Sequence, residues 1–192
     1  MTYAQSSTTC TATETNSSGS LSEAIPHLKY SGIQSLSRAE VIVTEKIDGT
    51  NAVVYVHEDG RVLAGSRNRW ITLDNENLGF ARYVEDHIEE FREMGPGYHY
   101  GEFIGCGIQR RYNNIPKEFV SFEHWRADLR FRTVPILYTG LWSQTAMTVI
   151  LQELKSGGSV LVPGFTDPEG IVVQFQGNKA RHIAFKMFCV EV

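Results

Sequence analysis

The chain has 192 residues, 42% of them hydrophobic, and a net charge of −4. This length predicts one domain with a sizeable core, and the acidic balance excludes a generally basic surface for nucleic acid or anionic membranes. Arginine outnumbers lysine. Because guanidinium groups bind phosphate in a bidentate manner, we expect a local anion site.

The three cysteines, Cys10, Cys106 and Cys189, are widely spaced and show no metal-binding pattern. They predict reduced thiols and a cytoplasmic, intracellular protein. No apolar run approaches the roughly 20 residues that span a bilayer. Residues 1–22 also lack the pattern of a secretory signal. We therefore expect no membrane partner.

The chain begins with a tail at residues 1–24 that is rich in Ser, Thr and Asn and is expected to be disordered. Residues 26–38 form a lead-in with scattered apolar side chains. Apolar runs at 41–43 and 52–56 predict two strands, and a turn at 58–60 leads to a return strand at 61–67. Residues 68–74 are expected to form a loop.

Apolar residues at near-helical spacing predict an amphipathic helix at 78–94. Further strands are expected at 98–105, 118–122 and 134–141, followed by a helix at 143–155 with Ser143 as its cap. The last predicted strands are at 170–174 and 183–190. Because strands dominate and short connections join most of them, the predicted class is α+β with largely antiparallel sheets.

Residues 45–51, with the sequence EKIDGTN, lie between the first two predicted strands. Side chains alternate along an extended chain, so Lys46 and Asp48 point to the same face. Gly49 allows the backbone to bend where a Cβ would obstruct it. A lysine beside a carboxylate on a rigid strand is a candidate nucleophile with its electrostatic partner, although a surface ion pair has the same pattern.

Four more short motifs follow, and each is weak alone. They are SRN at 66–68, GEFIG at 101–105, EGIVV at 169–173 and IAFKM at 183–187. In the last motif, Ile183, Phe185 and Met187 share one strand face, so Lys186 projects from the opposite face. Glu169 stands at the start of an apolar strand.

The order and content of the five motifs resemble the covalent nucleotidyltransferase superfamily of ATP-dependent ligases and RNA capping enzymes, and within it the phage-type RNA ligases. The resemblance implies antiparallel sheets flanked by helices, with a nucleotide pocket between them. It also implies an adenylation domain at residues 25–192 without a C-terminal accessory domain. The implied cofactors are ATP and Mg²⁺ or Mn²⁺.

The implied activity is RNA ligation, of the kind used in RNA repair. In the first step, Lys46 attacks the α-phosphate of ATP and releases pyrophosphate, which leaves a lysyl-AMP intermediate. AMP then passes to a 5′-phosphate end of RNA, and a 3′-hydroxyl attacks that end and displaces AMP. An accessory protein is a further implied partner, because many ligases grip nucleic acid through an additional domain.

The resemblance also implies roles for individual residues. The implied catalytic residues are Lys46, Asp48, Glu169 and Lys186, with Asp48 and Glu169 associated with the metal. The implied nucleotide-binding residues are Glu45, Asn51, Arg67, Glu102 and Phe122. In this assignment Glu102 bonds the ribose hydroxyls, Phe122 stacks on adenine and Glu45 touches the base.

Some of these residues have a second interpretation. Glu102 is also a candidate to pair with Arg67, and Phe122 is equally a candidate for the core. Arg110, Arg111 and Arg126 are expected on a surface that binds RNA phosphates, although a solvated face has the same composition.

The last motif departs from the pattern of many relatives, which carry two basic residues there. Lys186 stands alone in this motif, and Lys179 and Arg181 are the candidates to substitute for the missing one. This departure predicts reduced activity. The sequence ends six residues after Lys186, and the expected lack of an accessory domain predicts a protein that adenylates itself but seals RNA ends poorly or needs a partner.

The sequence leaves other functions open. A DNA ligase or a GTP-using capping-type enzyme fits the same chemistry. From other classes, a non-catalytic module that binds a nucleotide or RNA end and a plain antiparallel scaffold also fit. All the expected polar positions are occupied, which favours catalysis over the binding module.

Overall fold

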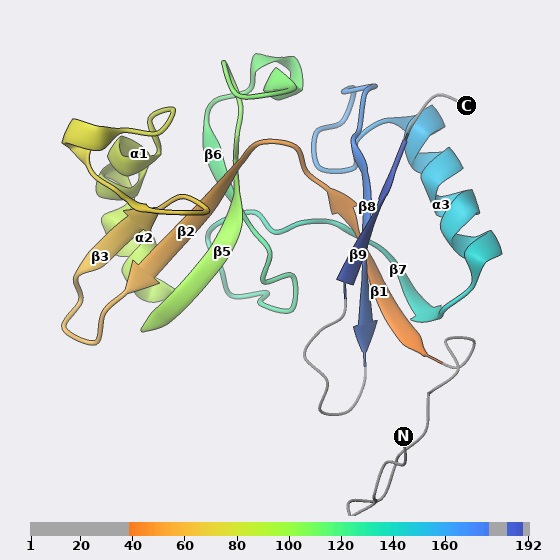
Figure 1. Ribbon diagram of the computed structural model, residues 1–192, viewed down its shortest axis with the longest axis horizontal. Coiled ribbons are helices and arrows are strands. Elements are labelled where there is room, and N and C mark those ends of the chain that lie inside the picture. Colours follow the sequence, from red (N-terminus) through yellow and green to blue (C-terminus); the bar gives the residue numbers. More distant parts are fainter. Residues whose placement is uncertain (1–38, 177–183, 190–192) are drawn as a thin grey trace, which may run out of the picture. The chain divides into compact units, whose positions relative to one another are not determined.

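The computed structural model describes residues 39–176 and 184–189. The predicted tail at 1–24 and the lead-in at 26–38 lie outside the described residues. The described part forms two antiparallel sheets with few helices (Figure 1), so the predicted α+β class is confirmed. Within it, no helix is long and apolar enough to cross a membrane.

The first sheet has four strands in the order β7-β1-β8-β9, and all neighbours pair antiparallel. Its strands are β1 (Glu40–Lys46), β7 (Ile136–Leu141), β8 (Gly170–Gln176) and β9 (Ala184–Phe188). Val41, Val43, Ile171 and Val173 are buried on one face against helix α3 (Gln144–Gly157). Because side chains alternate along a strand, the opposite face carries the intervening residues.

The second sheet has five strands in the order β4-β3-β2-β5-β6. Its strands are β2 (Thr50–Val56), β3 (Val62–Gly65), β4 (Trp70–Ile71), β5 (Gly97–Ile104) and β6 (Glu118–Ser121). Alternate residues such as Ala52, Val54 and Phe103 are buried on one face against α1 (Phe80–Asp86) and α2 (Ile88–Glu93). No helix of the described part covers the other face.

The segment 47–49 carries the chain from β1 in the first sheet to β2 in the second (Figure 1). Gly49 lies against β5 so closely that a Cβ at this position would collide with the carbonyl oxygen of Phe103 and lie 2.7 Å from Ile104. The predicted glycine bend is therefore confirmed, and it is a crossing between sheets rather than a hairpin.

Most predicted elements are confirmed within a few residues, including the helix capped by Ser143, whose side chain accepts a hydrogen bond from the Ala146 amide. The predicted last strand, at 183–190, is observed as β9, and positions 183 and 190 lie outside the described residues.

Two predicted elements were wrong in detail. The helix expected at 78–94 is two helices that meet at His87, whose φ is −119° and ψ is 28°. The His87 backbone amide keeps its helical hydrogen bond to the Tyr83 carbonyl oxygen at 3.1 Å, but the ring Nδ1 of His87 contacts the same oxygen at 2.9 Å. A side chain that bonds the backbone locally in this way competes with a continuing helix. The loop expected at 68–74 contains β4 and a short 3₁₀ helix, Leu73–Asn75.

Candidate nucleotide-binding site

A cavity of about 530 Å³ lies where the open faces of the two sheets meet. All nine residues that the sequence assigned to catalysis and nucleotide binding line it: Glu45, Lys46, Asp48, Asn51, Arg67, Glu102, Phe122, Glu169 and Lys186. They come from segments as far apart as β1 and β9. The cavity also has lining residues that sequence reasoning missed, among them Thr44, Val134 and Gln174, which carry no motif that marks them.

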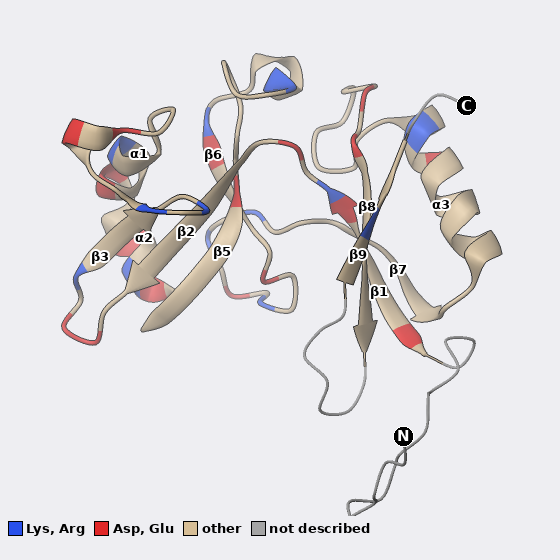
Figure 2. Cartoon of the chain, in the orientation of Figure 1, with Lys and Arg blue, Asp and Glu red and all other residues tan. Residues whose placement is uncertain are grey.

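The register of the first sheet places the two lysines on one face. Val172 of β8 pairs with Thr44 on one side and with Lys186 on the other. Lys46 pairs with Gly170, two residues further along. Residues directly opposite each other in an antiparallel sheet share a face, so Lys46 and Lys186 both project into the cavity (Figure 2 shows cationic residues on β1 and β9).

Lys46 is held by two neighbours. Its Nζ donates to the carboxylate of Glu169 and lies 5.7 Å from the centre of the Phe188 ring. The residue between Lys46 and Phe188 across β8 is Gly170, where a Cβ would collide with the Met187 carbonyl oxygen. Lys186, in contrast, is exposed and has no hydrogen bond or ion pair with the other described residues.

Asp48 is fixed from two sides. Its backbone amide donates to the hydroxyl of Tyr112 over 2.7 Å, and its Oδ2 accepts from Arg110 Nε over 3.0 Å. Arg110 also pairs with Asp167. Tyr112 is fully buried in a short run of left-handed backbone, with φ 41°. No spacing in the sequence signals that Tyr112 supports Asp48.

Glu102 lies directly opposite Asn51 in the pairing of β2 with β5. Its carboxylate accepts from the Gly49 amide at 3.0 Å and from Asn51 Nδ2 at 3.3 Å. Burial raises the pKa of Glu102 to about 7, against the opposing effect of the Gly49 hydrogen bond. No pair between Glu102 and Arg67 exists in the described part, so that alternative interpretation is not observed.

Glu45 is 1% exposed, although it borders the cavity. Its Oε2 accepts from the amides of Val160 and Leu161, each at 2.9 Å. Its Oε1 is buried and has no hydrogen-bond partner among the described residues. A buried carboxylate oxygen without a donor is costly.

The side of the cavity next to the second sheet is formed by Arg67 and Phe122. Arg67 is exposed, and its guanidinium has no hydrogen bond or ion pair within the described ranges. Phe122 both lines the cavity and packs on the cluster that contains Ile104 and Val120. Its two proposed uses, core and ring platform, are therefore compatible.

A family model described as RNA ligase matches residues 39–187. The chain belongs to the RNA ligase family. A comparison with curated protein sequences gives no match. The RNA ligase fold is also found by structure comparison, in variants of Naegleria gruberi RNA ligase.

One Naegleria variant, solved with ATP and Mn, has a TM-score of 0.58 and 22% identity, over 79% of this chain and 50% of that chain. Another, solved without ligand, has a TM-score of 0.57 and 23% identity, over 79% and 50%. A third, solved with AMP and Mn, has a TM-score of 0.57 and 22% identity, over 79% of this chain and 50% of that chain. The chain therefore spans about half the length of these relatives.

The donor set of the cavity fits a metal ion that is shared with a nucleotide. Asp48 and Glu169 both line the cavity, and each is paired with a cation, Arg110 or Lys46. The described residues contain no cluster of three His, Cys, Asp or Glu that would hold a metal alone. Mg²⁺ is commonly bound by one or two carboxylates, water and substrate phosphates, and the cavity offers two carboxylates for such a site.

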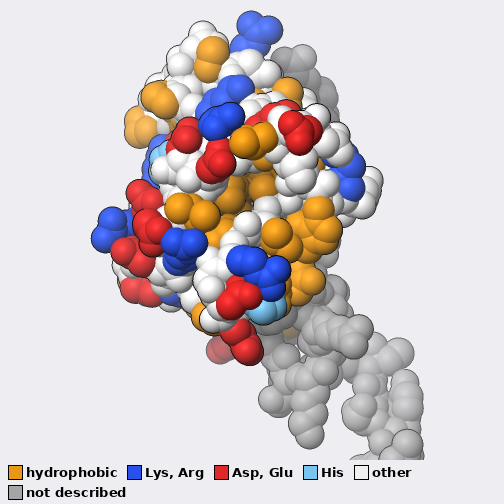
Figure 3. All heavy atoms as spheres, turned by 90° about the vertical axis from the view of Figure 1, so that its left-hand side faces the viewer, with side chains coloured by type: hydrophobic (Ala, Val, Ile, Leu, Met, Phe, Trp, Pro, Cys, Tyr) orange, Lys and Arg blue, Asp and Glu red, His pale blue; other side chains and the backbone are white. Residues whose placement is uncertain are grey.

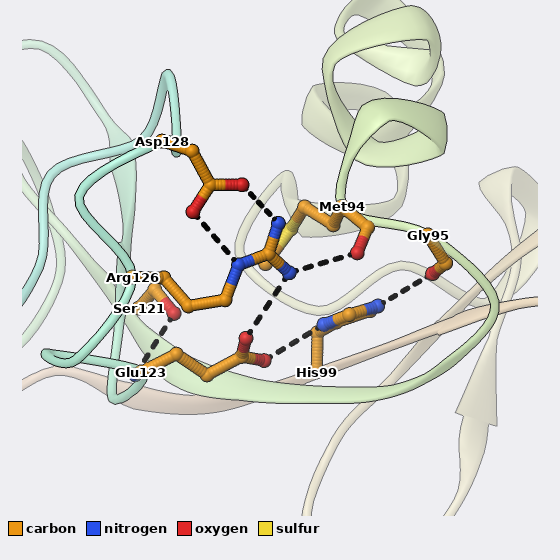
Figure 4. A network of polar contacts seen from close by, with 7 residues as sticks. All are labelled: Met94, Gly95, His99, Ser121, Glu123, Arg126 and Asp128. Atoms are coloured by element: carbon orange, nitrogen blue, oxygen red, sulfur yellow. Dashed lines mark hydrogen bonds and ion pairs between the residues drawn. The ribbon is translucent and has the colours of Figure 1, made fainter.

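The three arginines proposed for RNA lie outside the cavity lining and in different environments. Arg110 binds Asp48 and Asp167. Arg126 donates to Asp128 at 3.0 and 2.6 Å and to the Met94 carbonyl oxygen at 2.8 Å, and it pairs with Glu123 at 3.6 Å. Figure 4 shows this network. Arg111 is exposed and has no such partner in the described part.

His99 belongs to the same network as Arg126 (Figure 4). Its Nδ1 contacts Glu123 at 2.7 Å and its Nε2 contacts the Gly95 carbonyl oxygen at 2.8 Å. His99 is 6% exposed. Its ring therefore connects the turn before β5 to the segment after β6, in a structural role.

Proposed function

We propose that this RNA ligase family member forms a covalent adenylate on Lys46 with ATP and transfers AMP to the 5′-phosphate end of RNA. The observation that carries the proposal is the convergence of nine polar and aromatic residues from separate segments on one cavity, with Lys46 and Lys186 on the same sheet face. The site geometry matches what a lysine nucleophile, an anionic substrate and a ribose require.

The first step forms a P–N bond and breaks a P–O bond. Lys46 gives a proton to water and leaves its contact with Glu169, and its amine attacks the α-phosphorus of ATP while pyrophosphate departs. Negative charge grows on the phosphate oxygens during this transfer. Lys186, which is free of other partners in the described part, is the cation placed to stabilise that charge.

In the second step, an oxygen of the RNA 5′-phosphate attacks the phosphorus of lysyl-AMP, and the P–N bond breaks to return Lys46. In the third step, a 3′-hydroxyl gives its proton to water and attacks the activated 5′-phosphorus, and AMP leaves. Asp48 and Glu169 would hold a divalent metal together with the nucleotide, and the metal would neutralise charge at the phosphates.

The hydrogen-bonding capacity of Glu45 and Glu102 supports the proposed contacts to the base and the sugar. The unpartnered Oε1 of Glu45 is an acceptor, and adenine offers an amino group where guanine offers a carbonyl oxygen. This supports ATP over GTP. Glu102 already accepts two hydrogen bonds at the cavity wall, and its carboxylate has further acceptor capacity for ribose hydroxyls. The ring of Phe122 is proposed to stack on adenine. Arg67 is proposed to bind the ribose or a phosphate.

The proposed RNA contact is inferred from which arginines already have partners within the protein. Arg110 and Arg126 use their donors within the protein, so Arg111 is the best placed of the three arginines for an RNA phosphate. We expect this chain to adenylate itself and an accessory protein to assist the sealing of RNA ends. Cys106 and Cys189 form no disulfide within the described residues, which supports an intracellular location.

The test is incubation of the purified full chain with α-labelled ATP and Mg²⁺, followed by a denaturing gel. The expected result is a labelled band that needs Lys46, is absent in Lys46→Ala and is weak with labelled GTP. Addition of 5′-phosphorylated RNA should discharge the label onto the RNA. A folded protein that binds ATP without becoming labelled would instead indicate a non-catalytic binding module.

A further inference from the structure

The face of the second sheet that carries no helix exposes a group of aromatic rings. Trp70, Tyr98 and Tyr100 are 45%, 56% and 52% exposed. Tyr98 contacts Tyr100 with ring planes 12° apart, Trp70 with planes 24° apart, and Tyr55 with centroids 4.6 Å apart. Figure 3, which views the chain from the β3 side of this sheet, shows hydrophobic side chains gathered on the surface. We call Tyr55, Trp70, Tyr98 and Tyr100 the aromatic platform.

The aromatic platform is continuous with the nucleotide cavity. A smaller hollow of about 190 Å³ shares Asn51, Arg67 and Phe122 with that cavity. A third hollow of about 310 Å³ shares Arg67 and Tyr100 with the small one and is bordered by Trp70 and Tyr98. The three hollows form a track along β2 and β5 that begins at the nucleotide cavity and ends on the aromatic platform.

The residues that line the track make it electrostatically suited to bind an anion. Arg67 and Arg69 border the outer hollow, and no Asp or Glu among the described residues lines either of the two smaller hollows. Arg69 makes one weak contact, at 3.3 Å, to the Asn75 carbonyl oxygen, and Arg67 has no partner in the described part. Exposed rings beside arginines without a carboxylate partner are the combination that binds single-stranded nucleic acid through base stacking and phosphate contacts.

The alternation of β5 explains how the platform and the site share one face. Glu102, Tyr100 and Tyr98 are two residues apart along the strand, so they project to the same side. Gly101 and His99 project to the other side, toward the core. A strand that places a ribose-binding carboxylate at one end therefore also places two rings in line with it.

We propose that the aromatic platform binds unpaired RNA nucleotides adjacent to the reacting end, with bases stacked on Tyr98, Tyr100 and Trp70 and with Arg69 at a phosphate. This proposal rests on the proposed function, because the RNA end reacts in the neighbouring cavity. It adds a substrate class: the ligase grips single-stranded RNA next to the joint. Base pairs within a duplex do not offer free faces to the rings, so duplex RNA is a poor ligand for this surface.

The test compares the full-length wild type with two double variants, Tyr98→Ala with Tyr100→Ala and Tyr98→Phe with Tyr100→Phe. Trp125→Ala is the matched control, because Trp125 is 69% exposed and borders none of the three hollows. Affinity for a short 5′-phosphorylated single-stranded RNA is measured by fluorescence anisotropy without ATP. Thermal unfolding checks folding, and self-adenylation is measured separately without RNA.

The expected result is a loss of roughly tenfold or more for each stacking ring removed in the alanine variant. The phenylalanine variant and Trp125→Ala should bind as the wild type does, and self-adenylation should be unchanged in all. The loss should persist at raised salt, because stacking is not screened whereas phosphate contacts are. Wild-type affinity in the alanine variant, an equal loss in the phenylalanine variant, or equal affinity for blunt duplex RNA would overturn the proposal.

A second measurement does not depend on the alanine variant. Single-stranded RNA should quench the tryptophan fluorescence of the wild type and of Trp125→Phe but much less that of Trp70→Phe. Equal quenching in all three proteins would contradict stacking at Trp70. Absence of lysyl-AMP in the wild type would refute the proposed function on its own, whatever the RNA affinity.

Discussion

At the scale of single residues, the environment of Lys46 explains how a common lysine becomes a candidate nucleophile. Glu169 accepts from its Nζ, Phe188 lies beside it, and Gly170 provides the space between them. The exposed Lys186 lies on the same face as a second cation. One lysine is therefore oriented and the other is available to a phosphate.

Glu45 provides a prediction about base choice. In Glu45→Gln, the side-chain oxygen is expected to keep the amides of Val160 and Leu161, so an amino group replaces the unpartnered Oε1. That donor suits the guanine carbonyl oxygen and opposes the adenine amino group. We expect the ratio of ATP to GTP use in self-adenylation to fall by roughly tenfold or more, in line with one lost or mismatched buried hydrogen bond. An unchanged ratio would remove Glu45 from the base-binding residues.

Glu102 provides a prediction about pH. Its pKa is raised to about 7 in the folded protein, so between its ordinary value and pH 7 the folded state binds more protons than the unfolded state. The free energy of unfolding therefore falls as pH rises through this window, and the cost is fully present above it. Glu102→Gln removes this titration. The free energy of unfolding of the variant, minus that of the wild type, should therefore increase from about pH 5 to about pH 8, by at most about 3 kcal/mol.

The measurement for Glu102 is urea unfolding of both proteins at the two pH values. A stability difference that is the same at both would show that Glu102 does not titrate in this range. Asn51→Ala is a suitable companion, because it removes one partner of the carboxylate and leaves the titrating group in place.

At the scale of elements, the crossing from β1 to β2 is the feature that joins the two halves of the site. It brings Lys46 from one sheet and Asn51 from the other within five residues of chain. The close approach of Gly49 to Phe103 is what makes this crossing short. The site therefore depends on backbone packing as much as on its polar side chains.

Gly49→Ala tests that dependence. The added Cβ would collide with the Phe103 carbonyl oxygen and approach Ile104, so we expect a loss of about 1–3 kcal/mol in the free energy of unfolding and a loss of self-adenylation. Gly157→Ala is the control, because nothing lies within 4 Å of a Cβ there and the residue ends α3. Equal stabilities of the two variants would contradict the packing argument.

The network in Figure 4 predicts that Arg126 contributes to the stability of the fold. Arg126→Ala removes contacts to Asp128, Glu123 and Met94, and we expect a loss of about 1–3 kcal/mol in stability. Arg82→Ala should cost less than about 1 kcal/mol, because its pair with Glu85 is exposed. Chemical denaturation measures both. If RNA affinity falls in Arg126→Ala while stability does not, the arginine belongs to the RNA surface instead.

At the scale of the whole molecule, local sequence patterns predicted the strands, because alternation is a local signal, and the resemblance of short motifs to a known family predicted the nine cavity residues. Lys186 was placed on its face from the alternation of Ile183, Phe185 and Met187, and the register confirms it. The break at His87 was missed because the apolar spacing continues through it. Tyr112 and Asp167 were missed because their contacts with Asp48 and Arg110 join distant parts of the chain.

The aromatic platform could not be predicted from the sequence either, for a related reason. Tyr98 and Tyr100 look like ordinary strand residues until the sheet order shows which face lacks a helix. Trp70 joins them only because the short strand β4 pairs with β3. Which side chains meet across a sheet is decided by register, and register is not visible in isolated segments.

In the proposed reaction, AMP is carried by Lys46 rather than by Lys186, the other lysine in the cavity. The most direct measurement is intact-mass analysis of the protein after incubation with ATP and Mg²⁺, followed by peptide mapping of the adduct under conditions that preserve the P–N bond. We expect one AMP per chain, on Lys46, and no adduct in Lys46→Ala. An adduct on Lys186, or a folded and nucleotide-binding protein that gains no mass, would contradict it.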